Sequence, residues 1–188
     1  MKIKGSHIKI ILVLILIVIT FYEVYQYFKP VKTIFIKGLP FSFREDIKQA
    51  FKVKAFPNEE LFHGLFTDYK LRNVTILFKP STPETNALYQ LETFEIVYKL
   101  VRYENITKSP LIEKKQFNAK EIDSYENITR EEDILKIILV PPDFSNETKV
   151  VAGGNRIWIY GKTKKDFDLA VIKALLSIMN VKSLKGFV

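Results

Sequence analysis

Short polar segments follow two apolar runs of the chain and hold the side chains best placed to bind a ligand. The apolar runs are residues 74–78 and 135–140, and hydroxyl, amide and carboxylate groups follow each of them closely. If both runs are parallel strands, their carboxyl ends lie at one edge of a sheet, where open α/β sheets bind ligands. The expected contact residues are Ser81, Thr82, Asp143 and Ser145, and the same loops also hold Glu84, Thr85 and Asn146.

The sequence contains almost none of the residues used in cysteine and histidine chemistry. The chain of 188 residues has no Cys and only two His, which excludes disulfides, thiolate nucleophiles, CxxC redox chemistry and zinc fingers. One of the two, His63, lies beyond the N-terminal region, but no G-x-S-x-G nucleophile motif accompanies it. We interpret His63 as a packed or surface residue, and we expect no catalytic residue and no metal site.

A glycine, a lysine and a threonine at 161–163 lie between a predicted strand and a predicted helix, where phosphate-binding loops occur. The position five residues before Gly161 is Arg156 rather than the glycine that such a loop requires, so the backbone arc that wraps a phosphate is missing. We interpret the segment as a tight turn and a helix cap, and we expect no cofactor. We interpret three acidic clusters as helix starts or solvated faces; they are Glu59-Glu60, Glu131-Glu132-Asp133, and Asp166 with Asp168.

The chain is basic, with 29 Lys and Arg residues against 21 Asp and Glu residues and a net charge of +8. The basic residues are spread along the sequence in runs of at most two, and no pattern of aromatic residues and arginines that would stack on bases occurs. We therefore expect no nucleic-acid partner. The positive charge favours attraction to anionic lipid headgroups or to an acidic surface glycan instead.

An apolar segment near the N-terminus predicts a transmembrane helix. Residues 8–28 would span about 31 Å at 1.5 Å per residue, close to the hydrocarbon thickness of a bilayer. Signal peptidase requires small residues after the apolar core, whereas the first alanine of the chain is Ala50. We therefore expect an uncleaved signal anchor at 8–28, with residues 1–7 in the cytoplasm.

The basic residues on the two sides of this segment nearly balance, so the positive-inside rule alone leaves the orientation open. Four Asn-x-Thr sequons, more than chance predicts for this composition, favour a domain outside the cytoplasm in an organism that glycosylates asparagine. The sequon residues are Asn73, Asn105, Asn127 and Asn146. We expect a single-pass glycoprotein of the cell membrane whose C-terminal domain lies outside.

Periodicity and capping patterns predict the elements of that domain. The predicted strands are 33–37, 74–78, 135–140, 149–152 and 156–160, and the predicted helices are 43–52, 83–103 and 164–180. Ser42 with Glu45, and Thr163 with Asp166, match the pattern of a capped helix start. In the helix 83–103, a period of 3.6 residues predicts a buried face of Leu88, Leu91, Phe94, Val97, Tyr98 and Val101. The helix 164–180 has only a narrow polar stripe, which indicates packing on more than one side.

These elements predict one α/β domain over residues 31–188, with a mixed sheet of about five strands that includes a C-terminal β-hairpin and is covered by helices. The turn of that hairpin is Gly153-Gly154-Asn155. The mostly polar stretch 104–133 predicts a surface insertion with a short helix at 119–125. The strand order is similar to a thioredoxin-like fold that lacks one helix, but the redox pair expected near Ser81 is absent, so redox activity is not implied.

One segment carries a resemblance to known sequences, namely GNRIWIYGKTKKDFDLAVIKALL at 154–176. With the Cys-free composition rich in Ile, Lys and Glu, the anchor and the sequons, the chain resembles the uncharacterised small single-pass membrane proteins of hyperthermophilic archaea. The resemblance implies a thermophilic source and brings no active site with it. A type IV pilin is a further possibility, because a basic leader ends at Gly5, although the fifth mature residue would be Ile10 rather than the usual glutamate.

We expect a membrane-tethered accessory domain without catalytic activity, which contacts a partner protein at the cell surface or in a membrane complex. One alternative is a membrane-anchored hydrolase or ligand-binding domain that uses the strand-end loops 80–86 and 141–148, and a second is a pilin-like subunit. An enzyme would show a concave pocket at Ser81, Thr82 and Asp143, whereas a scaffold would show a flat or apolar surface. The expected partners are membrane lipid, bound through the N-terminal helix, and a surface or membrane protein.

Overall fold

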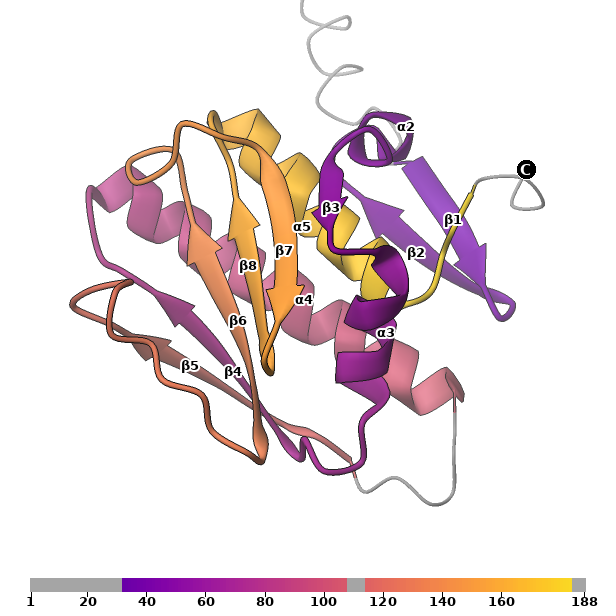
Figure 1. Cartoon of the computed structure of the whole chain (residues 1–188). Helices are drawn as coiled ribbons and strands as arrows, with labels where there is room; N and C mark the ends of the chain where they lie inside the picture. Colours follow the sequence, from indigo (N-terminus) through magenta and orange to yellow (C-terminus); the bar gives the residue numbers. More distant parts are fainter. Residues whose placement is uncertain (1–31, 108–113, 184–188) are drawn as a thin grey trace, which may run out of the picture. The chain divides into compact units, whose positions relative to one another are not determined.

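A mixed six-stranded β-sheet with helices packed on one face forms the centre of the structure (Figure 1). The computed structural model describes residues 32–107 and 114–183. The predicted cytoplasmic segment 1–7 and the predicted membrane segment 8–28 lie outside these residues. Within the described part of the chain, no helix is both long enough and apolar enough to cross a membrane. The expected α/β domain with a mixed sheet is confirmed.

The sheet has the strand order β3-β7-β8-β6-β4-β5. Its strands are β3 (Lys54–Phe56), β4 (Asn73–Phe78), β5 (Gln116–Glu121), β6 (Ile134–Val140), β7 (Lys149–Gly153) and β8 (Arg156–Tyr160). Strands β4, β5, β6 and β8 run parallel, β7 is antiparallel to β8, and β3 is parallel to β7. The sheet has six strands rather than about five because the sequence pattern predicts neither β3 nor β5, while the strand expected at 33–37 lies in a separate hairpin.

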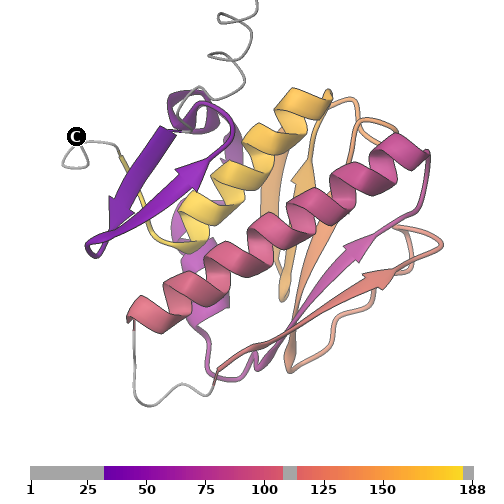
Figure 2. The same ribbon diagram turned by 180° about the vertical axis from the view of Figure 1, so that it is seen from behind.

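Two long helices cross the same face of the sheet, α4 (Pro83–Thr107) and α5 (Lys164–Ile178), as Figure 2 shows. Two shorter helices, α3 (Glu59–Thr67) and α2 (Ile47–Ala50), contact α5. None of the described helices covers the opposite face. There, a smaller cluster forms in which Ile122, Tyr125 and Ile128 pack with Leu77, Ile138, Val140, Trp158 and Tyr160. The main core therefore lies between the sheet and its helices.

The central strand β6 shows how an almost continuous apolar run serves both faces. Ile137 and Leu139 belong to the main core, and the alternate residues Ile138 and Val140 belong to the smaller cluster. Successive side chains of a strand point to opposite faces. A strand covered on both sides is therefore apolar throughout, which is why the sequence predicts β6 correctly.

A second, two-stranded sheet precedes the large one. Strands β1 (Lys32–Ile36) and β2 (Leu39–Phe43) pair antiparallel across a two-residue turn. Lys37 and Gly38 form this turn, and both have positive φ, as the tight turns of β-hairpins require. The inward side chains of the hairpin join the main core, and they are Ile34, Ile36, Phe41 and Phe43.

The predicted helix 43–52 is wrong. Only the four residues of α2 are helical there, and its N-cap is Asp46, which accepts a hydrogen bond from the Lys48 N–H at 2.8 Å. Ser42, which the sequence suggests as the cap, lies in β2 and hydrogen-bonds Thr33 across the hairpin at 2.8 Å. Burial of alternate residues in β2 outweighs the capping pattern, because it places two phenylalanine rings in the core.

Two described parts of the polar stretch 104–133, which the sequence predicts to be a surface insertion, belong to regular elements of the fold. Residues 104–107 continue α4, and β5 extends the sheet by pairing in parallel with β4, so the helix expected at 119–125 is wrong. The one hydrophobic side chain of β5 that packs against the core is Phe117. Backbone hydrogen bonds hold such a polar edge strand, and the side-chain pattern gives little sign of it.

Helix α4 turns a different face to the core from the one that periodicity predicts. The buried residues are Thr85, Tyr89, Glu92, Ile96, Lys99, Leu100 and Tyr103. Of the predicted face, Leu88 and Val97 are half-buried, and Leu91, Phe94, Tyr98 and Val101 are exposed. Helix α4 therefore has two faces with hydrophobic residues, and the sequence pattern assigned the outer one to the core.

Helix α5 and the hairpin before it follow the sequence closely. Strands β7 and β8 join through a turn at Gly154 and Asn155, both with positive φ. The hydroxyl of Thr163 accepts a hydrogen bond from the Asp166 N–H at 3.1 Å and caps α5. Even Lys173, in the predicted polar stripe of α5, is buried, because α2, α3 and α4 pack against this helix as well as the sheet. The expected packing on more than one side is confirmed.

Gly161 lies where β8 passes into α5, and a larger residue has no room there. A Cβ atom at this position would overlap the Cα and Cβ atoms of Phe167 in the first turn of α5. The strand and the helix can approach so closely only because residue 161 has no side chain. The close approach gives this glycine a structural role and agrees with the interpretation of 161–163 as a turn and cap.

We predict that Gly161→Ala lowers the free energy of unfolding by about 1–3 kcal/mol, because the methyl group forces β8 and α5 apart. Gly64→Ala is the matched control, since Gly64 lies in α3 with open space around its Cα. Alanine there is expected to raise the free energy of unfolding by up to about 1 kcal/mol through helix propensity. Denaturant unfolding followed by circular dichroism measures both, and equal effects would contradict the overlap.

Candidate functional site

Two of the four strand-end residues that the sequence predicts as contacts, Ser81 and Asp143, meet at the carboxyl edge of the sheet. Asp143 Oδ2 accepts a hydrogen bond from Ser81 Oγ and another from Thr85 Oγ1, each at 2.6 Å. Ser81 lies between β4 and α4, and Asp143 lies between β6 and β7. The two loops are brought together because β4 and β6 are adjacent and parallel. The role of these residues as ligand contacts stays a prediction.

The other two expected contact residues have local hydrogen bonds instead. Thr82 Oγ1 accepts a hydrogen bond from the Thr85 N–H at 3.2 Å, at the start of α4. Ser145 Oγ donates to the Glu147 carbonyl at 2.9 Å and accepts from its N–H at 3.1 Å. Thr85, which follows in the same segment, is the threonine that contacts the Asp143 carboxylate. The spacing Thr82-x-x-Thr85 is the signal for this, because residues three apart share one side of a helix.

The hydrogen bonds within this cluster limit the chemistry that it can do. The hydroxyls of Ser81 and Thr85 hold the pKa of Asp143 below its usual range, and attraction to the Lys164 ammonium adds to the effect. A carboxylate that stays ionised in this way is a weak general base. The hollows described in the structure are lined by other residues. The cluster therefore acts as a clamp between two loops.

The remaining candidates from the sequence have structural partners. His63 Nδ1 hydrogen-bonds the Ile178 carbonyl at 2.8 Å, which joins α3 to the end of α5. Glu59 and Glu60 form the first turn of α3, as expected, and they pair with Lys173 and Lys182. In the described ranges, no group of three or more His, Asp or Glu side chains is arranged to hold a metal ion.

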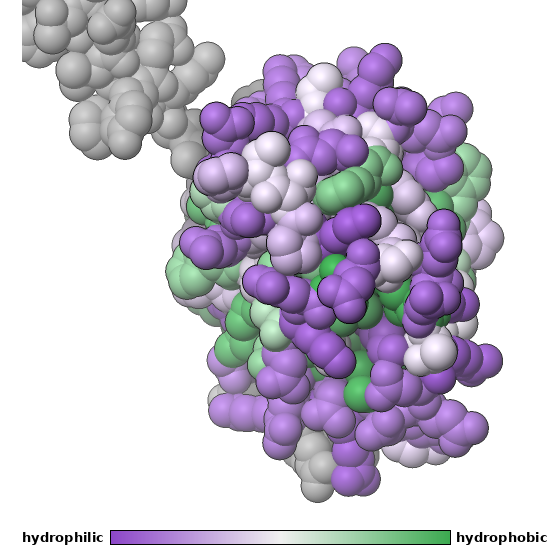
Figure 3. All heavy atoms as spheres, turned by 90° about the vertical axis from the view of Figure 1, so that its left-hand side faces the viewer, coloured by the Kyte–Doolittle hydropathy of each residue, from purple (hydrophilic) through white to green (hydrophobic). Residues whose placement is uncertain are grey.

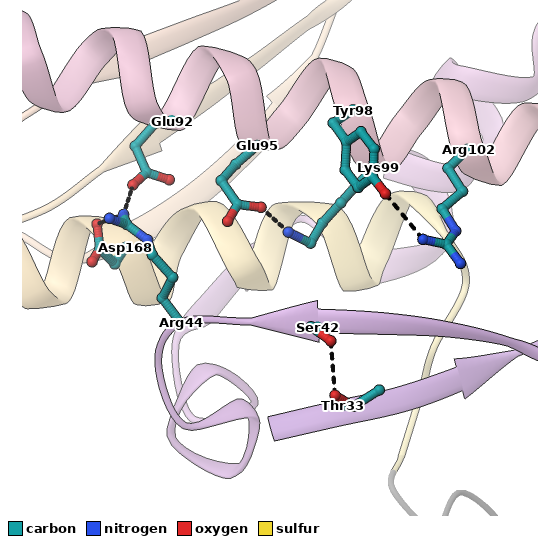
Figure 4. Close-up of polar contacts among 9 residues, drawn as sticks. All are labelled: Thr33, Ser42, Arg44, Glu92, Glu95, Tyr98, Lys99, Arg102 and Asp168. Atoms are coloured by element: carbon teal, nitrogen blue, oxygen red, sulfur yellow. Dashed lines mark hydrogen bonds and ion pairs between the residues drawn. The ribbon is translucent and has the colours of Figure 1, made fainter. Parts of the chain in front are cut away.

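A cluster of charges joins the β1–β2 hairpin to α4 and α5 (Figure 4). Arg44, directly after β2, pairs with Glu92 of α4 and with Asp168 of α5, the latter at 3.1 Å. Farther along α4, Lys99 pairs with Glu95. Glu92 and Lys99 are only 2% and 3% exposed. Sequence reasoning missed this cluster, although the helical spacing of its three α4 residues was a signal.

Burial shifts the ionisation of both inward-facing groups. It raises the pKa of Glu92 to about 8, and the neighbouring Asp168 carboxylate adds to this rise. It also lowers the pKa of Lys99 to about 8. The positive charges of Arg44 and Lys99 oppose the rise for Glu92 but do not cancel it. Burial therefore favours the protonated form of Glu92 over its carboxylate.

Exposed hydrophobic side chains run along the outward side of α4, and we call this row the α4 stripe. Its residues and their exposed fractions are Leu91 (39%), Phe94 (67%), Tyr98 (50%) and Val101 (37%). The rings of Phe94 and Tyr98 stack with their centroids 5.8 Å apart and their planes 11° from parallel. Scattered exposed hydrophobic residues are ordinary, whereas a continuous row at helical spacing is typical of a binding surface.

The α4 stripe borders a shallow groove of about 500 Å³. The hairpin tip contributes Leu39 to it, and α4 contributes Phe94, Val97, Tyr98, Val101, Arg102, Asn105 and Ile106. Arg102 Nη1 donates a hydrogen bond to the Tyr98 hydroxyl at 3.1 Å, so a polar contact borders the apolar surface (Figure 4). Sequence reasoning missed this groove because it assigned the stripe to the core.

A second hollow, of about 470 Å³, lies between β4, β5, β6 and the segment after β5, and its lining is largely polar. The side of the molecule that carries β5 is mostly hydrophilic, with small hydrophobic areas between polar side chains (Figure 3). The one lysine of β6 in this hollow, Lys136, donates to the Thr129 carbonyl at 2.7 Å and pairs with Glu131. Its charge is thus used within the protein, and the groove on α4 remains the better candidate site.

Comparison with known proteins identifies no family. No protein-family model, no curated protein and no solved structure matches the chain. The similarity to a thioredoxin-like fold and the resemblance to archaeal membrane proteins therefore gain no support, and they stay predictions. Function has to be argued from the surfaces of this chain.

We predict that Glu92→Gln changes how stability depends on pH. In the native protein, folding raises the pKa of Glu92 from 4.5 to about 8, so stability from this group is full below pH 4.5 and falls as the pH rises to 8. Glutamine imitates the protonated acid and removes this loss. Relative to the native chain, the variant should gain up to about 1.4 kcal/mol for each pH unit in that window.

Denaturant unfolding at pH 5 and at pH 8 measures this effect. The gain should be small at pH 5 and several-fold larger at pH 8. Glu84→Gln is the control, because Glu84 is exposed at the start of α4. Equal pH dependence of the native chain and the Glu92→Gln variant would contradict the burial of a titrating acid at this position.

Proposed function

We propose that this protein is a membrane-tethered accessory domain outside the cytoplasm, which binds a partner protein through the α4 stripe and has no catalytic role. The observation that carries the proposal is the exposure of four hydrophobic side chains in one row of a long helix. Removing such surface from water favours association by roughly 25 cal/mol per Å². A helix surface of this kind suits a partner that offers an apolar groove or a helix of its own.

The strand-end loops give less support to the alternative of a hydrolase or ligand-binding domain. Both hydroxyls of the cluster donate to Asp143, so neither can donate to a substrate while that bond is kept. The pilin-like alternative depends on residues outside the described part of the chain, and no observation there favours it.

The position of β1 in the sequence supports a membrane-linked role for the domain. Strand β1 begins at Lys32, only a few residues after the predicted membrane segment 8–28. The tip of the same hairpin supplies Leu39 to the groove. So short a connection would keep the domain, and the groove with it, within reach of a membrane or surface protein.

The sequons provide a test of the placement outside the cytoplasm. We predict that Asn127 and Asn146 carry glycans in the native organism, because both are exposed in loops. Asn73 is expected to stay unmodified, since it is half-buried in β4 between two neighbouring strands. Asn105 is exposed but borders the groove, where a glycan would compete with a partner. Intact-mass measurement should show a mass loss for Asn127→Gln and Asn146→Gln and none for Asn73→Gln; a chain without any glycan would contradict this placement.

A single introduced thiol tests whether a partner covers the α4 stripe, because the chain has no cysteine of its own. We predict that Phe94→Cys in full-length protein reacts with a membrane-impermeant maleimide at least about tenfold more slowly in native membranes than after purification in detergent. The physical reason is that a bound partner shields the groove.

Lys165→Cys is the matched control, at the exposed start of α5. This thiol should react equally fast in both preparations, and it should react on intact cells if the domain lies outside. Equal reactivity of Phe94→Cys before and after purification would contradict the proposed contact. Reaction of Lys165→Cys only after cell lysis would contradict the placement outside the cytoplasm.

A further inference from the structure

The side chains of the α4 stripe have the same order of chemical types and the same spacing from either end of the row. Along the chain, an aliphatic residue, two aromatic residues and an aliphatic residue follow one another at intervals of three, four and three positions. A twofold-symmetric interface requires a patch that is complementary to itself, and a palindromic row meets this requirement. We propose that the α4 stripe binds the α4 stripe of a second copy of this chain, with the two helices antiparallel. This inference rests on the proposed function, because it names the partner of the same surface.

Antiparallel pairing matches every residue of the row. Leu91 of each copy meets Val101 of the other, and Phe94 of each meets Tyr98 of the other. Alternating intervals of three and four residues are those at which two helices interlock their side chains. The aromatic rings then lie at the centre of the interface, where binding energy concentrates, and the aliphatic residues close its two ends.

The position of the β1–β2 hairpin also fits an antiparallel pair. The hairpin lies along one flank of α4, where Lys99 Nζ is 4.8 Å from the ring centroid of Phe43 and the Arg102 guanidinium is 5.4 Å from that of Phe41. In an antiparallel pair of helices, like flanks face each other across the seam. The two hairpins therefore come to the same side of the seam, and the described domain of each copy begins on that side.

The charges beside the stripe favour a second copy over an anionic lipid surface. Among the charged side chains of α4 that reach solvent, Glu84, Glu95 and Glu104 outnumber Arg102, so an anionic surface gains little attraction there. Between two copies, Glu95 meets Glu95. Each of these charges is balanced by its ion pair with Lys99 of the same chain, so their meeting opposes association only weakly.

The size of the interface sets the conditions under which pairing is expected. Stable interfaces bury about 1,200–2,000 Å² in total, which is more than four side chains and Leu39 on each copy provide. Two copies tethered to one membrane have a high effective concentration, so weak contacts suffice there. Pairing is therefore expected in the membrane and not in dilute detergent solution.

A thiol at position 97 tests the pairing in full-length chain in its membrane. Val97 borders the stripe on the flank away from Lys99 and Arg102, and the antiparallel arrangement places it opposite Val97 of the second copy. Mild oxidation of Val97→Cys is expected to give a disulfide-linked dimer as the main product. A disulfide requires Cβ atoms about 3.5–4.5 Å apart, and the antiparallel arrangement brings the two side chains at position 97 together. Lys165→Cys, the matched control, should give no more than about a tenth of that dimer.

A charge exchange tests the antiparallel register. In the Val97→Cys background, Tyr98→Glu places a carboxylate against Phe94 of the other copy and should reduce dimer formation about tenfold or more. Adding Phe94→Lys places a lysine opposite that glutamate in both symmetry-related pairs and should restore the dimer. A parallel pair would set lysine against lysine, so failure of the rescue overturns the antiparallel arrangement. Circular dichroism of each purified variant checks that it folds.

The outcomes separate this inference from the proposed function. Suppose that Val97→Cys gives no dimer while the thiol at position 94 stays shielded in native membranes. Another protein then covers the stripe, so the inference of a second copy is overturned and the proposed function stands. If the thiol at position 94 is also shielded in lipid vesicles that hold one copy each, lipid covers the stripe and the inference of a second copy is again overturned. If the thiol at position 94 is never shielded, both proposals are overturned.

Discussion

The burial of Glu92 and Lys99 beneath the β1–β2 hairpin is tied to the choice of which face of α4 reaches water. A buried charge is costly unless it is paired or neutralised, and here Arg44 pairs with Glu92 while burial favours its protonated form. Turning α4 by half a turn would place both groups in solvent and bury the α4 stripe instead. The observed orientation keeps the charges inside, so the contacts that hold the hairpin are also those that leave four hydrophobic side chains exposed.

The hairpin connects the start of the described chain to the helix that carries the candidate site. Its inward side chains belong to the main core, and the residue that follows it, Arg44, bridges α4 and α5. The large sheet takes no direct part in this connection. The hairpin is therefore held to α4 and α5 by its core packing and by the ionic contacts of Arg44.

The sequence predicts those parts of the fold whose pattern has a single physical meaning. Runs buried on both faces mark β4, β6 and β8, and Thr163 with Asp166 marks the start of α5. It fails where two meanings compete: Ser42 and Glu45 match a helix cap but lie beside a strand that buries alternate residues. Periodicity finds an apolar face on α4 but cannot tell which of two turns inward, since that depends on Arg44, nearly fifty residues away. The meeting of Ser81 and Asp143 follows from strand order, whereas the groove on α4 follows from a helix rotation that no local pattern records.

The carboxyl edge of the sheet has the topology of a binding site, but the donor groups of its loops are already hydrogen-bonded within the protein. In parallel sheets the loops at this edge usually offer donors and acceptors to a ligand, but here Ser81 and Thr85 donate to Asp143 and join the loops to each other. The surface whose interactions remain unsatisfied is instead hydrophobic and lies on the helical layer. A partner bound there would be selected by the spacing and shape of the α4 stripe, with the hydrogen bond between Arg102 and Tyr98 as a polar boundary. A partner that reproduces that spacing in reverse fits such a surface better than a small polar molecule does.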